Sequence, residues 1–192
     1  IPILEVKGYE ADDVIGTLAT QASHFDIETY MLTPDKDYGQ LVKDNVFIYR
    51  PRHGGGYEIL GVEQIKEKYQ IESPSQVIDI LALMGDSADN FPGCPGVGEK
   101  TAIKLINDFK SISNLLENTH QLKGKLKEKV EGAVEDIKMS NFLATIKTDV
   151  PIELNLTDLQ LTPPNEEKLR ALFDELEFRT LANKFFKKTE NI

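Results

Sequence analysis

The sequence predicts an α/β fold in which a central, mostly parallel sheet is flanked by helices and followed by a helical region. Two observations favour it. Segments rich in strand formers alternate with segments of helical periodicity as far as residue 60, whereas later segments are nearly all helical. A turn rich in glycine and proline at residues 93–98 separates an apolar helical segment from an amphipathic one. We therefore expect an α/β core over residues 1–92 and a helical region over residues 93–192.

The first half contains the predicted strands. Residues 1–6 are apolar and branched, as in a short buried strand, and residues 27–33 are rich in strand formers and end at Pro34. Between them, apolar residues at positions 14, 15, 18, 19 and 22 repeat at helical spacing. Strands at 45–50 and 57–60 are expected to pair as a hairpin across a glycine-rich loop.

The second half is predicted to be helical. Ser73, Pro74 and Gln76 have the order of an N-cap, an N1 proline and an N3 partner, which predicts a helix from 74 to 84. Shorter helices are expected before it, at 38–42 and 62–69. Later helices are expected at 99–109, 111–117, 123–145, 165–176 and 178–186, with a short extended piece at 151–156.

Composition limits the class of protein. With 40% hydrophobic residues among 192, the chain can bury a core, and its apolar runs fall short of the roughly 20 residues that span a bilayer, so we expect no membrane partner. The single Cys94 excludes an intramolecular disulfide and a cysteine-based zinc site, which fits a cytoplasmic location. The chain starts at Ile1 without an initiator methionine or a signal-peptide pattern, so we interpret it as a fragment.

The charge is unevenly distributed along the chain. A net charge of −10 argues against a simple basic DNA-binding patch. Between Pro95 and Val130, however, seven lysines stand against four acids. An acidic half joined to a basic stretch suits a metal-dependent enzyme that acts on a polyanion, although a solvated helix face explains the lysines of residues 123–129 about as well.

Seven carboxylates occur in three segments. Two segments follow the order strand, acids, helix, and the third follows the end of the helix at 74–84. Because ligands bind at the carboxyl ends of the strands in open α/β sheets, we expect the acids to meet at one place, although acids in a first helical turn also serve as helix caps. The seven are Glu10, Asp12, Asp13, Asp35, Asp37, Asp86 and Asp89.

Such a cluster requires protons or cations. Two unit charges about 4 Å apart repel by roughly 4 kcal/mol at an effective dielectric constant of about 20. One cysteine and three poorly placed histidines, His24, His53 and His120, leave oxygen ligands, which favour Mg²⁺ or Mn²⁺ over zinc. A pair of such ions activates water and stabilises the leaving oxygen of a phosphodiester. Lys36 either contacts the phosphate under attack or forms an ion pair with neighbouring acids.

The glycine-rich turn is suited to phosphate. Residues 95–98 carry little side-chain bulk, so the backbone N–H groups at the start of the following helix can approach a phosphate closely, assisted by the helix dipole. Lys100 and Lys104 lie one turn apart on the same face of that helix and can reach one nucleic-acid backbone.

Four motifs occur in a fixed order along the chain. They are Gly8-Tyr9-Glu10-Ala11-Asp12-Asp13, Thr33-Pro34-Asp35-Lys36-Asp37, Gly85-Asp86-Ser87-Ala88-Asp89-Asn90 and Gly93-Cys94-Pro95-Gly96-Val97-Gly98-Glu99-Lys100-Thr101-Ala102. Together they resemble the 5′-nuclease family, which contains the 5′-nuclease domain of bacterial DNA polymerase I, the phage 5′→3′ exonucleases and the flap endonucleases. The resemblance covers essentially the whole chain.

The resemblance implies roles for these residues. Residues 1–92 would be the C-terminal part of the metal-binding nuclease core, and residues 93–192 its helix–hairpin–helix and helical DNA-binding region. The acids of the first two motifs match first-site and bridging ligands of two divalent ions, and Asp86 and Asp89 match the second metal group. Asp12, Asp13 and Lys36 would be catalytic. The DNA-binding residues would be Pro95, Gly96, Val97, Gly98, Lys100, Thr101 and Lys104, with a monovalent cation, K⁺, on the hairpin carbonyls.

The resemblance also implies an activity, the removal of 5′ flaps and RNA primers from branched or nicked duplex DNA in replication and repair, in the nucleoid of a bacterial cell. A polymerase portion would follow in the parent chain. The family's first strand with its Asp-Gly pair, a further acid and a basic helical arch would precede Ile1. We therefore expect this chain to lack two metal ligands and to depend on that segment for catalysis.

Two other interpretations stay open. Phosphatases of the haloacid dehalogenase type also place an Asp-x-Asp after a strand, as residues 33–37 do, but Tyr38-Gly39 departs from their pattern and they have no use for the glycine hairpin. A non-catalytic module that binds duplex DNA would need only the hairpin with Lys100 and Lys104, and its acids would be an incomplete site.

Overall fold

The computed structural model describes residues 1–52 and 54–189, with side chains as far as residue 186. His53, which the sequence predicts to be a poor ligand, lies outside the described residues. The chain divides into two units, one of residues 4–154 and one of residues 155 onward together with residues 1–3. In the part of the chain that the structure describes, no helix is both long and apolar enough to cross a bilayer.

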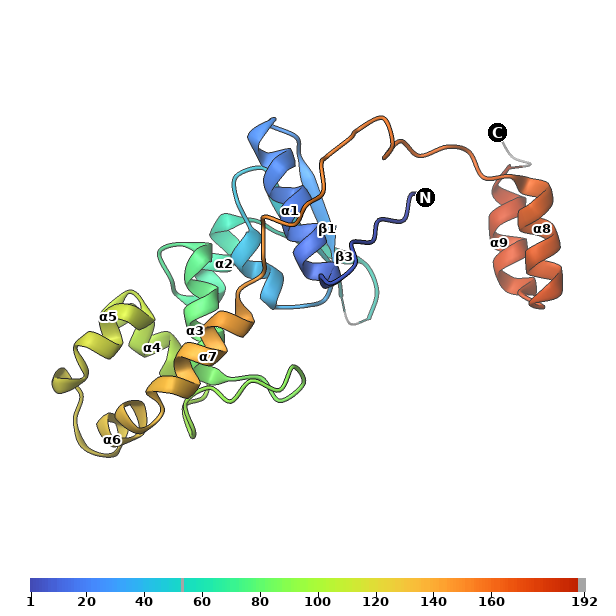
Figure 1. The fold of residues 1–192 in the computed structure, drawn as a ribbon. Coiled ribbons are helices and arrows are strands. Elements are labelled where there is room, and N and C mark those ends of the chain that lie inside the picture. Colours follow the sequence, from blue (N-terminus) through green and yellow to red (C-terminus); the bar gives the residue numbers. More distant parts are fainter. Residues whose placement is uncertain (53, 190–192) are drawn as a thin grey trace. The chain divides into compact units, whose positions relative to one another are not determined.

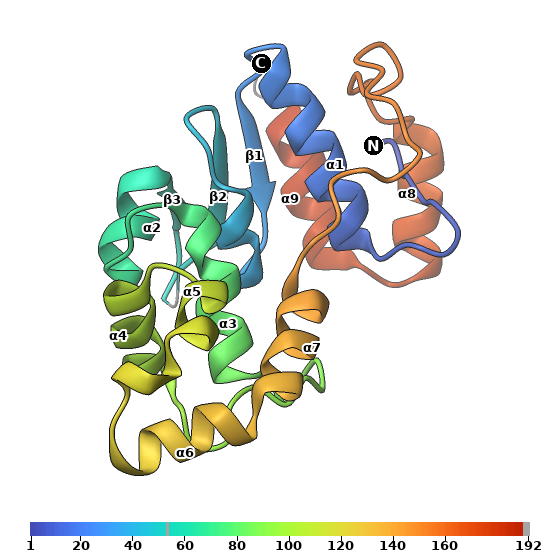
Figure 2. The same ribbon diagram turned by 60° about the vertical axis from the view of Figure 1, so that its left-hand side comes forward.

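The larger unit contains a three-stranded mixed sheet of order β1-β2-β3. Strand β1 (Thr29–Leu32) pairs in parallel with β2 (Val46–Pro51), and β2 pairs antiparallel with β3 (Tyr57–Leu60). Figure 2 shows the three strands side by side. The alternation of strand and helix at this end of the chain confirms the predicted fold class, and the hairpin of β2 and β3 makes the sheet mixed.

Helices pack around this sheet because their apolar faces repeat at helical spacing. Helix α1 (Ala11–His24) packs beside β1, and the single turn η1 (Asp37–Leu41) follows β1 (Figure 1). Helix α2 (Val62–Tyr69) follows β3. Helix α3 (Val77–Met84), preceded by the turn η2 (Pro74–Gln76), is the most buried helix of the core.

The remaining helices of the larger unit are built on α3. They are α4 (Glu99–Phe109), α5 (Ile112–Glu117), the turn η3 (Thr119–Gln121), α6 (Gly124–Gly132) and α7 (Val134–Ala144). Both α4 and α7 pack against α3, and Figures 1 and 2 show α7 beside it. Val46 of the sheet, Ile80 of α3, Ile106 of α4 and Ile137 of α7 belong to one contiguous buried core. Strand and helical regions therefore share one core within residues 4–154.

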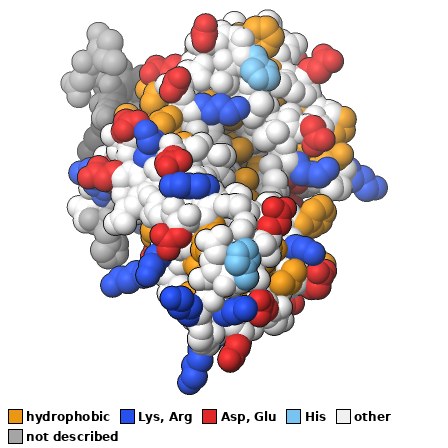
Figure 3. Space-filling model, turned by 90° about the vertical axis from the view of Figure 1, so that its left-hand side faces the viewer, with side chains coloured by type: hydrophobic (Ala, Val, Ile, Leu, Met, Phe, Trp, Pro, Cys, Tyr) orange, Lys and Arg blue, Asp and Glu red, His pale blue; other side chains and the backbone are white. Residues whose placement is uncertain are grey.

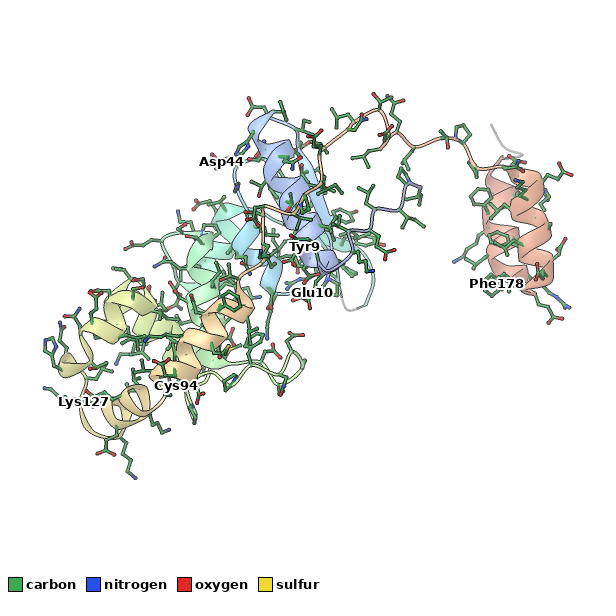
Figure 4. The ribbon with its side chains drawn as sticks, in the orientation of Figure 1. Tyr9, Glu10, Asp44, Cys94, Lys127 and Phe178 are labelled. Carbon is green, nitrogen blue, oxygen red and sulfur yellow. The ribbon has the colours of Figure 1, made fainter. Side chains whose placement is uncertain are left out.

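The second unit contains two helices, α8 (Glu166–Glu175) and α9 (Arg179–Thr189), which pack against each other. Asn165 caps α8 by accepting a hydrogen bond from the Lys168 N–H at 2.9 Å. The Phe173 ring contacts Phe178, and the Arg170 guanidinium lies 3.6 Å from the centre of the Phe186 ring. Figure 4 shows Phe178 at one end of this helix pair.

Two predictions about secondary structure are wrong. Residues 1–6 form no strand, and the side chains of Ile1 and Ile3 are 99% and 91% exposed. Branched apolar residues form a strand only where a neighbouring strand accepts and donates their hydrogen bonds, and β1 pairs only with β2 in the described sheet. The helix expected over 123–145 is two helices, since the weak helix former Gly132 ends α6 and Ala133 (φ −112°) turns the chain into α7.

Candidate functional site

The first acidic segment forms the start of α1. Glu10 is the N-cap, with an exposed side chain, and its N–H donates to Asp13 Oδ2 at 3.3 Å. The other carboxylate oxygen of Asp13, Oδ1, accepts a hydrogen bond from the Lys147 N–H at 2.9 Å. Asp13 therefore caps its own helix and also binds a distant segment. Figure 4 shows Tyr9 and Glu10 at this end of α1.

Asp13 belongs to a row of polar side chains along α1. Thr17 and Gln21 follow at one-turn spacing, and all three bind the backbone of residues 147–154, which we call the α1 strap. The Val150 N–H donates to Thr17 Oγ1 at 3.1 Å, and the Leu154 N–H donates to Gln21 Oε1 at 2.7 Å. The strap closes the larger unit by tying its last residues to its first helix.

Asp12 joins the first acidic segment to the second. Its Oδ1 accepts a hydrogen bond of 2.8 Å from the hydroxyl of Tyr38, a buried residue of η1. Burial, followed by the hydrogen bond to Asp12, raises the pKa of the Tyr38 hydroxyl, so this group stays a donor over the physiological range. Sequence reasoning missed Tyr38 as a residue of the site, although it follows directly after the second acidic segment.

The second segment lies immediately after β1. Asp35 Oδ1 accepts a hydrogen bond of 2.9 Å from the Asp37 N–H. Asp37 is partly buried, and its Oδ1 is the one buried side-chain polar atom without a hydrogen-bond partner among the residues that the structure describes. Burial, followed by the negative charge of Asp35, raises the Asp37 pKa from 3.8 to about 7, and Asp89 and Asp86 add to the rise.

The third segment is the loop after α3. Asp86 Oδ1 accepts a hydrogen bond from the Ala88 N–H at 2.8 Å, and Asp86 Oδ2 forms an ion pair with the Lys36 ammonium. The bond to Lys36 is the main reason why the Asp86 pKa is lowered. Asp89 is exposed on the same loop. Of the two interpretations of Lys36, the ion pair is the one present, and its partner comes from the third segment instead of the adjacent acids.

The acidic loop is closed at its neck by glycines. Asp86 and Phe91 exchange two backbone hydrogen bonds of 3.0 Å. Gly85 and Gly93 have φ values of +71° and +62°, and a Cβ on Gly93 would collide with the backbone of Gly85. A cleft of about 510 Å³ lies against this loop, and Asp86, Asn90 and Phe91 are among its lining residues.

The three acidic segments thus meet in the fold. The Tyr38–Asp12 hydrogen bond joins the first to the second, and the Lys36–Asp86 ion pair joins the second to the third. Within residues 1–52 and 54–189, however, no group of three His, Cys, Asp or Glu side chains is spaced to hold a metal ion. The unpartnered Asp37 oxygen, whose carboxyl pKa is raised by the charges of three further carboxylates, fits a site that a hard cation completes. The assignment of individual ligands stays a prediction.

The glycine hairpin connects the acidic loop to α4. The Val97 N–H donates to the Cys94 carbonyl at 2.9 Å, with Pro95 and Gly96 between them, and Gly96 has φ +72°. A positive φ at the third position, after proline at the second, is typical of a type II turn and favours glycine there. The Gly93 N–H donates to the buried Ser140 Oγ of α7 at 2.8 Å, a contact that sequence reasoning missed.

The N-terminus of α4 follows the hairpin directly. Gly98 is its N-cap and accepts hydrogen bonds from Thr101 and Ala102. Lys100 and Lys104 are exposed, as predicted for one face of this helix, whereas Thr101 is half-buried. Figure 3 views the molecule from the side of α5 and α6. At the lower end of that view, lysine and arginine side chains lie among acidic ones.

Comparisons with known proteins agree with this geometry. Residues 1–70 match the family described as 5′-3′ exonuclease, N-terminal resolvase-like domain, and residues 72–167 match 5′-3′ exonuclease, C-terminal SAM fold. The chain is 46% identical over 179 residues to DNA polymerase I of Bacillus subtilis and 42% identical over 183 residues to the thermostable DNA polymerase I of Thermus thermophilus. These alignments cover 92% and 95% of the chain but only 20% and 21% of the relatives, so the chain spans about a fifth of their length.

The fold is also that of a solved nuclease. The bacteriophage T5 D15 flap endonuclease, solved as a pseudo-enzyme-product complex with DNA and metal ions, superposes with a TM-score of 0.68 at 21% identity, over 77% of this chain and 54% of that chain. Because both family models describe 5′-3′ exonucleases, the matches exclude the interpretation as a phosphatase of the haloacid dehalogenase type. With both of its domains matched in sequence, the chain belongs to the 5′-3′ exonuclease family.

Proposed function

We propose that this chain is the metal-dependent 5′-nuclease part of a DNA polymerase I, and that it hydrolyses phosphodiesters at 5′ flaps and RNA primers on branched or nicked duplex DNA. The observation that carries the proposal is the meeting of three acidic segments beside Lys36, directly before a phosphate-suited hairpin. Relatives named DNA polymerase I support a polymerase portion after this chain in its parent, and a role in bacterial replication and repair at the nucleoid.

The metal site in this proposal combines the acids of the three segments. Asp35, Asp86 and Asp89 act on Asp37 electrostatically, and the acids of α1 approach through Tyr38; the full ligand set is Glu10, Asp12, Asp13, Asp35, Asp37, Asp86 and Asp89. Divalent ions, Mg²⁺ or Mn²⁺, supply an activated water and stabilisation of the leaving oxygen when bound. Metal ions in the T5 flap endonuclease support this cofactor class.

The protein residues have separate tasks in this scheme. Tyr38 holds the Asp12 carboxylate in one orientation. Asp37, which is protonated in part near neutral pH, loses its proton when a cation binds. Lys36 neutralises Asp86 in the absence of a cation, and once released from that carboxylate its ammonium can bind the phosphate under attack.

In the proposed division, residues 93–192 bind duplex DNA and residues 1–92 contain the catalytic site. The hairpin and α4 provide backbone N–H groups and the exposed Lys100 and Lys104, with Thr101 between them. The DNA in the T5 complex supports the substrate class. A monovalent cation, K⁺, on the hairpin carbonyls is part of the same proposal.

A non-catalytic duplex-binding module is the second candidate. It is favoured by one observation, that the described acids are not spaced to hold a metal ion. The two candidates differ in cleavage. A 5′-labelled flapped duplex is incubated with this chain, and with the longer parent chain, in Mg²⁺, Mn²⁺ or chelator. If the duplex is cut and chelator abolishes the cutting, the result supports the nuclease. If the duplex is bound but neither chain cuts it, the result supports the non-catalytic module.

A further inference from the structure

Lys129 of α6 reaches across to the hairpin that precedes α4. Its Nζ donates a hydrogen bond to the Gly96 carbonyl oxygen at 3.3 Å, between residues 33 positions apart. A Cβ added at Gly96 would collide with this Nζ, and the other atom that it would meet within 4 Å is Cε of the same lysine. The Lys129 side chain therefore covers the turn at its glycine.

A second observation places the same charge beside the turn. Cys94, the first residue of the turn, is buried, and burial raises the pKa of its thiol. The positive charge of Lys129 opposes that rise. The charge of Lys129 thus acts on Cys94 as well as on Gly96, the residues on either side of Pro95. Figure 4 shows Cys94 at the hairpin and Lys127 on α6.

The hairpin has an anchor at each of two points. Ser140 of α7 accepts the Gly93 N–H at its start, and Lys129 of α6 donates to Gly96 at its turn. The backbone runs from Gly96 through Gly98, the N-cap, into α4. The ammonium group on the Gly96 carbonyl therefore lies two residues before the N-cap, after which the N–H groups open α4 ahead of its first intrahelical bonds.

We propose that Lys129 is a positioning residue for duplex DNA, which acts through the Gly96 carbonyl to hold the start of α4 in the orientation that receives a phosphate. The inference rests on the proposed DNA binding by the hairpin. It differs from a direct phosphate contact, because the partner of the ammonium is the Gly96 carbonyl oxygen of this chain.

The test uses three variants of the chain. Lys129→Met removes the charge and the donors but keeps the length of the side chain, and Lys129→Arg keeps a charged donor. Lys127→Met is the matched control, because Lys127 lies on the same helix, carries the same charge and pairs with Glu131 at 3.7 Å instead of with the hairpin. Thermal unfolding first establishes that all three variants fold.

Hydrogen exchange of the Val97 N–H without DNA measures the turn itself, since this N–H closes the turn onto Cys94. We expect exchange to be about five- to tenfold faster in Lys129→Met, which is the effect of losing one ordinary, solvent-exposed hydrogen bond. Exchange should be unchanged in Lys127→Met and close to wild type in Lys129→Arg. Equal exchange in Lys129→Met and wild type would overturn the inference.

Affinity for nicked duplex DNA, measured between about 50 mM and about 200 mM salt, gives the second readout. We expect about five- to tenfold weaker binding for Lys129→Met than for Lys127→Met, recovery in Lys129→Arg, and the same salt slope for both Met variants. A salt slope that is lower by about one in Lys129→Met alone would show that Lys129 contacts a phosphate directly. Equal affinities of Lys129→Met and Lys127→Met would show that Lys129 contributes only its positive charge. Both outcomes overturn the positioning role. Absence of binding by the unmodified chain would instead count against DNA binding by its hairpin, and the exchange measurement would still decide the Lys129–Gly96 contact.

Discussion

The Lys147 N–H donates a hydrogen bond to the Asp13 carboxylate across 134 positions of sequence. Asp13 also accepts the Glu10 N–H, so both of its oxygens serve the backbone. A residue that the sequence assigns to metal binding therefore has a structural task, and substitutions can separate the two.

Asp13→Ala should lower the free energy of unfolding by about 1–3 kcal/mol, because two backbone N–H groups lose their acceptor. Asp13→Asn keeps an acceptor oxygen for Lys147 and should cost about 1 kcal/mol or less. Urea unfolding measures both, with Asp44→Ala, a change at an exposed carboxylate, as the control. A nuclease activity that is lost in the stable Asp13→Asn variant would identify a ligand, whereas full activity there would leave Asp13 with the structural task alone.

Asp37 should make the metal-free chain less stable as pH rises. Its pKa is raised from 3.8 to about 7 on folding, so the folded state holds a proton that the unfolded state releases above about pH 4. The stabilisation from this proton is fully present below about pH 4 and is lost as pH rises toward 7. Because the group is only partly buried, the change should be about 1–3 kcal/mol.

The variant Asp37→Asn isolates this effect. Urea unfolding in chelator at pH 5 and pH 8 should show the wild type losing stability relative to the variant, and Mg²⁺ should reverse the order at pH 8 by stabilising only the wild type. A stability difference that is independent of pH would contradict the raised pKa.

Substitutions of Lys36 and of Asp86 should change the affinity for a divalent metal ion in opposite directions. Lys36→Met removes the cation that competes for the Asp86 carboxylate, so Mn²⁺ should bind several-fold more tightly, while Asp86→Asn should weaken binding by about tenfold or more. Calorimetric titration with Mn²⁺ measures both, and Lys43→Met, which removes an exposed lysine, controls for net charge. Equal affinity of Asp86→Asn and the wild type would remove Asp86 from the ligand set.

The paired change Lys100→Ala with Lys104→Ala should weaken binding to nicked or flapped duplex and reduce the salt slope by about two, one for each lost phosphate contact. The control is Lys66→Ala with Lys68→Ala on α2, which removes the same charge elsewhere on the larger unit. Fluorescence anisotropy at several salt concentrations measures the slopes. If both pairs behave alike, α4 is not the DNA-binding helix.

Local patterns were sufficient to predict most of the secondary structure. The apolar spacing of residues 14–22 predicts α1, and the strand formers before Pro34 predict β1. The apolar residues 1–6 carry the same local signal as β1, but a strand also needs a partner, which the local sequence does not reveal. The break between α6 and α7 depends on Gly132. Some helices tolerate glycine in their interior, but here α6 ends at Gly132.

The candidate site was predictable in its residue types and less so in its contacts. Three acidic segments and a Pro-Gly turn are visible as motifs. The contacts of Asp13 with Lys147, of Lys36 with Asp86 and of Lys129 with Gly96 join residues that are 134, 50 and 33 positions apart. Such pairs are set by how helices pack, and a single sequence has no period or spacing that encodes them.

The glycine neck of the acidic loop separates two parts of the molecule that are adjacent in sequence. Gly85 and Gly93 touch, and Asp86 pairs with Phe91, so the chain enters and leaves the loop at one fixed point. The start of the hairpin is held independently by Ser140. Residues can therefore be inserted, removed or exchanged between Asp86 and Phe91 without shifting the register of α4. The charge of this loop can therefore change while the hairpin and α4, the proposed DNA-binding surface, keep their place.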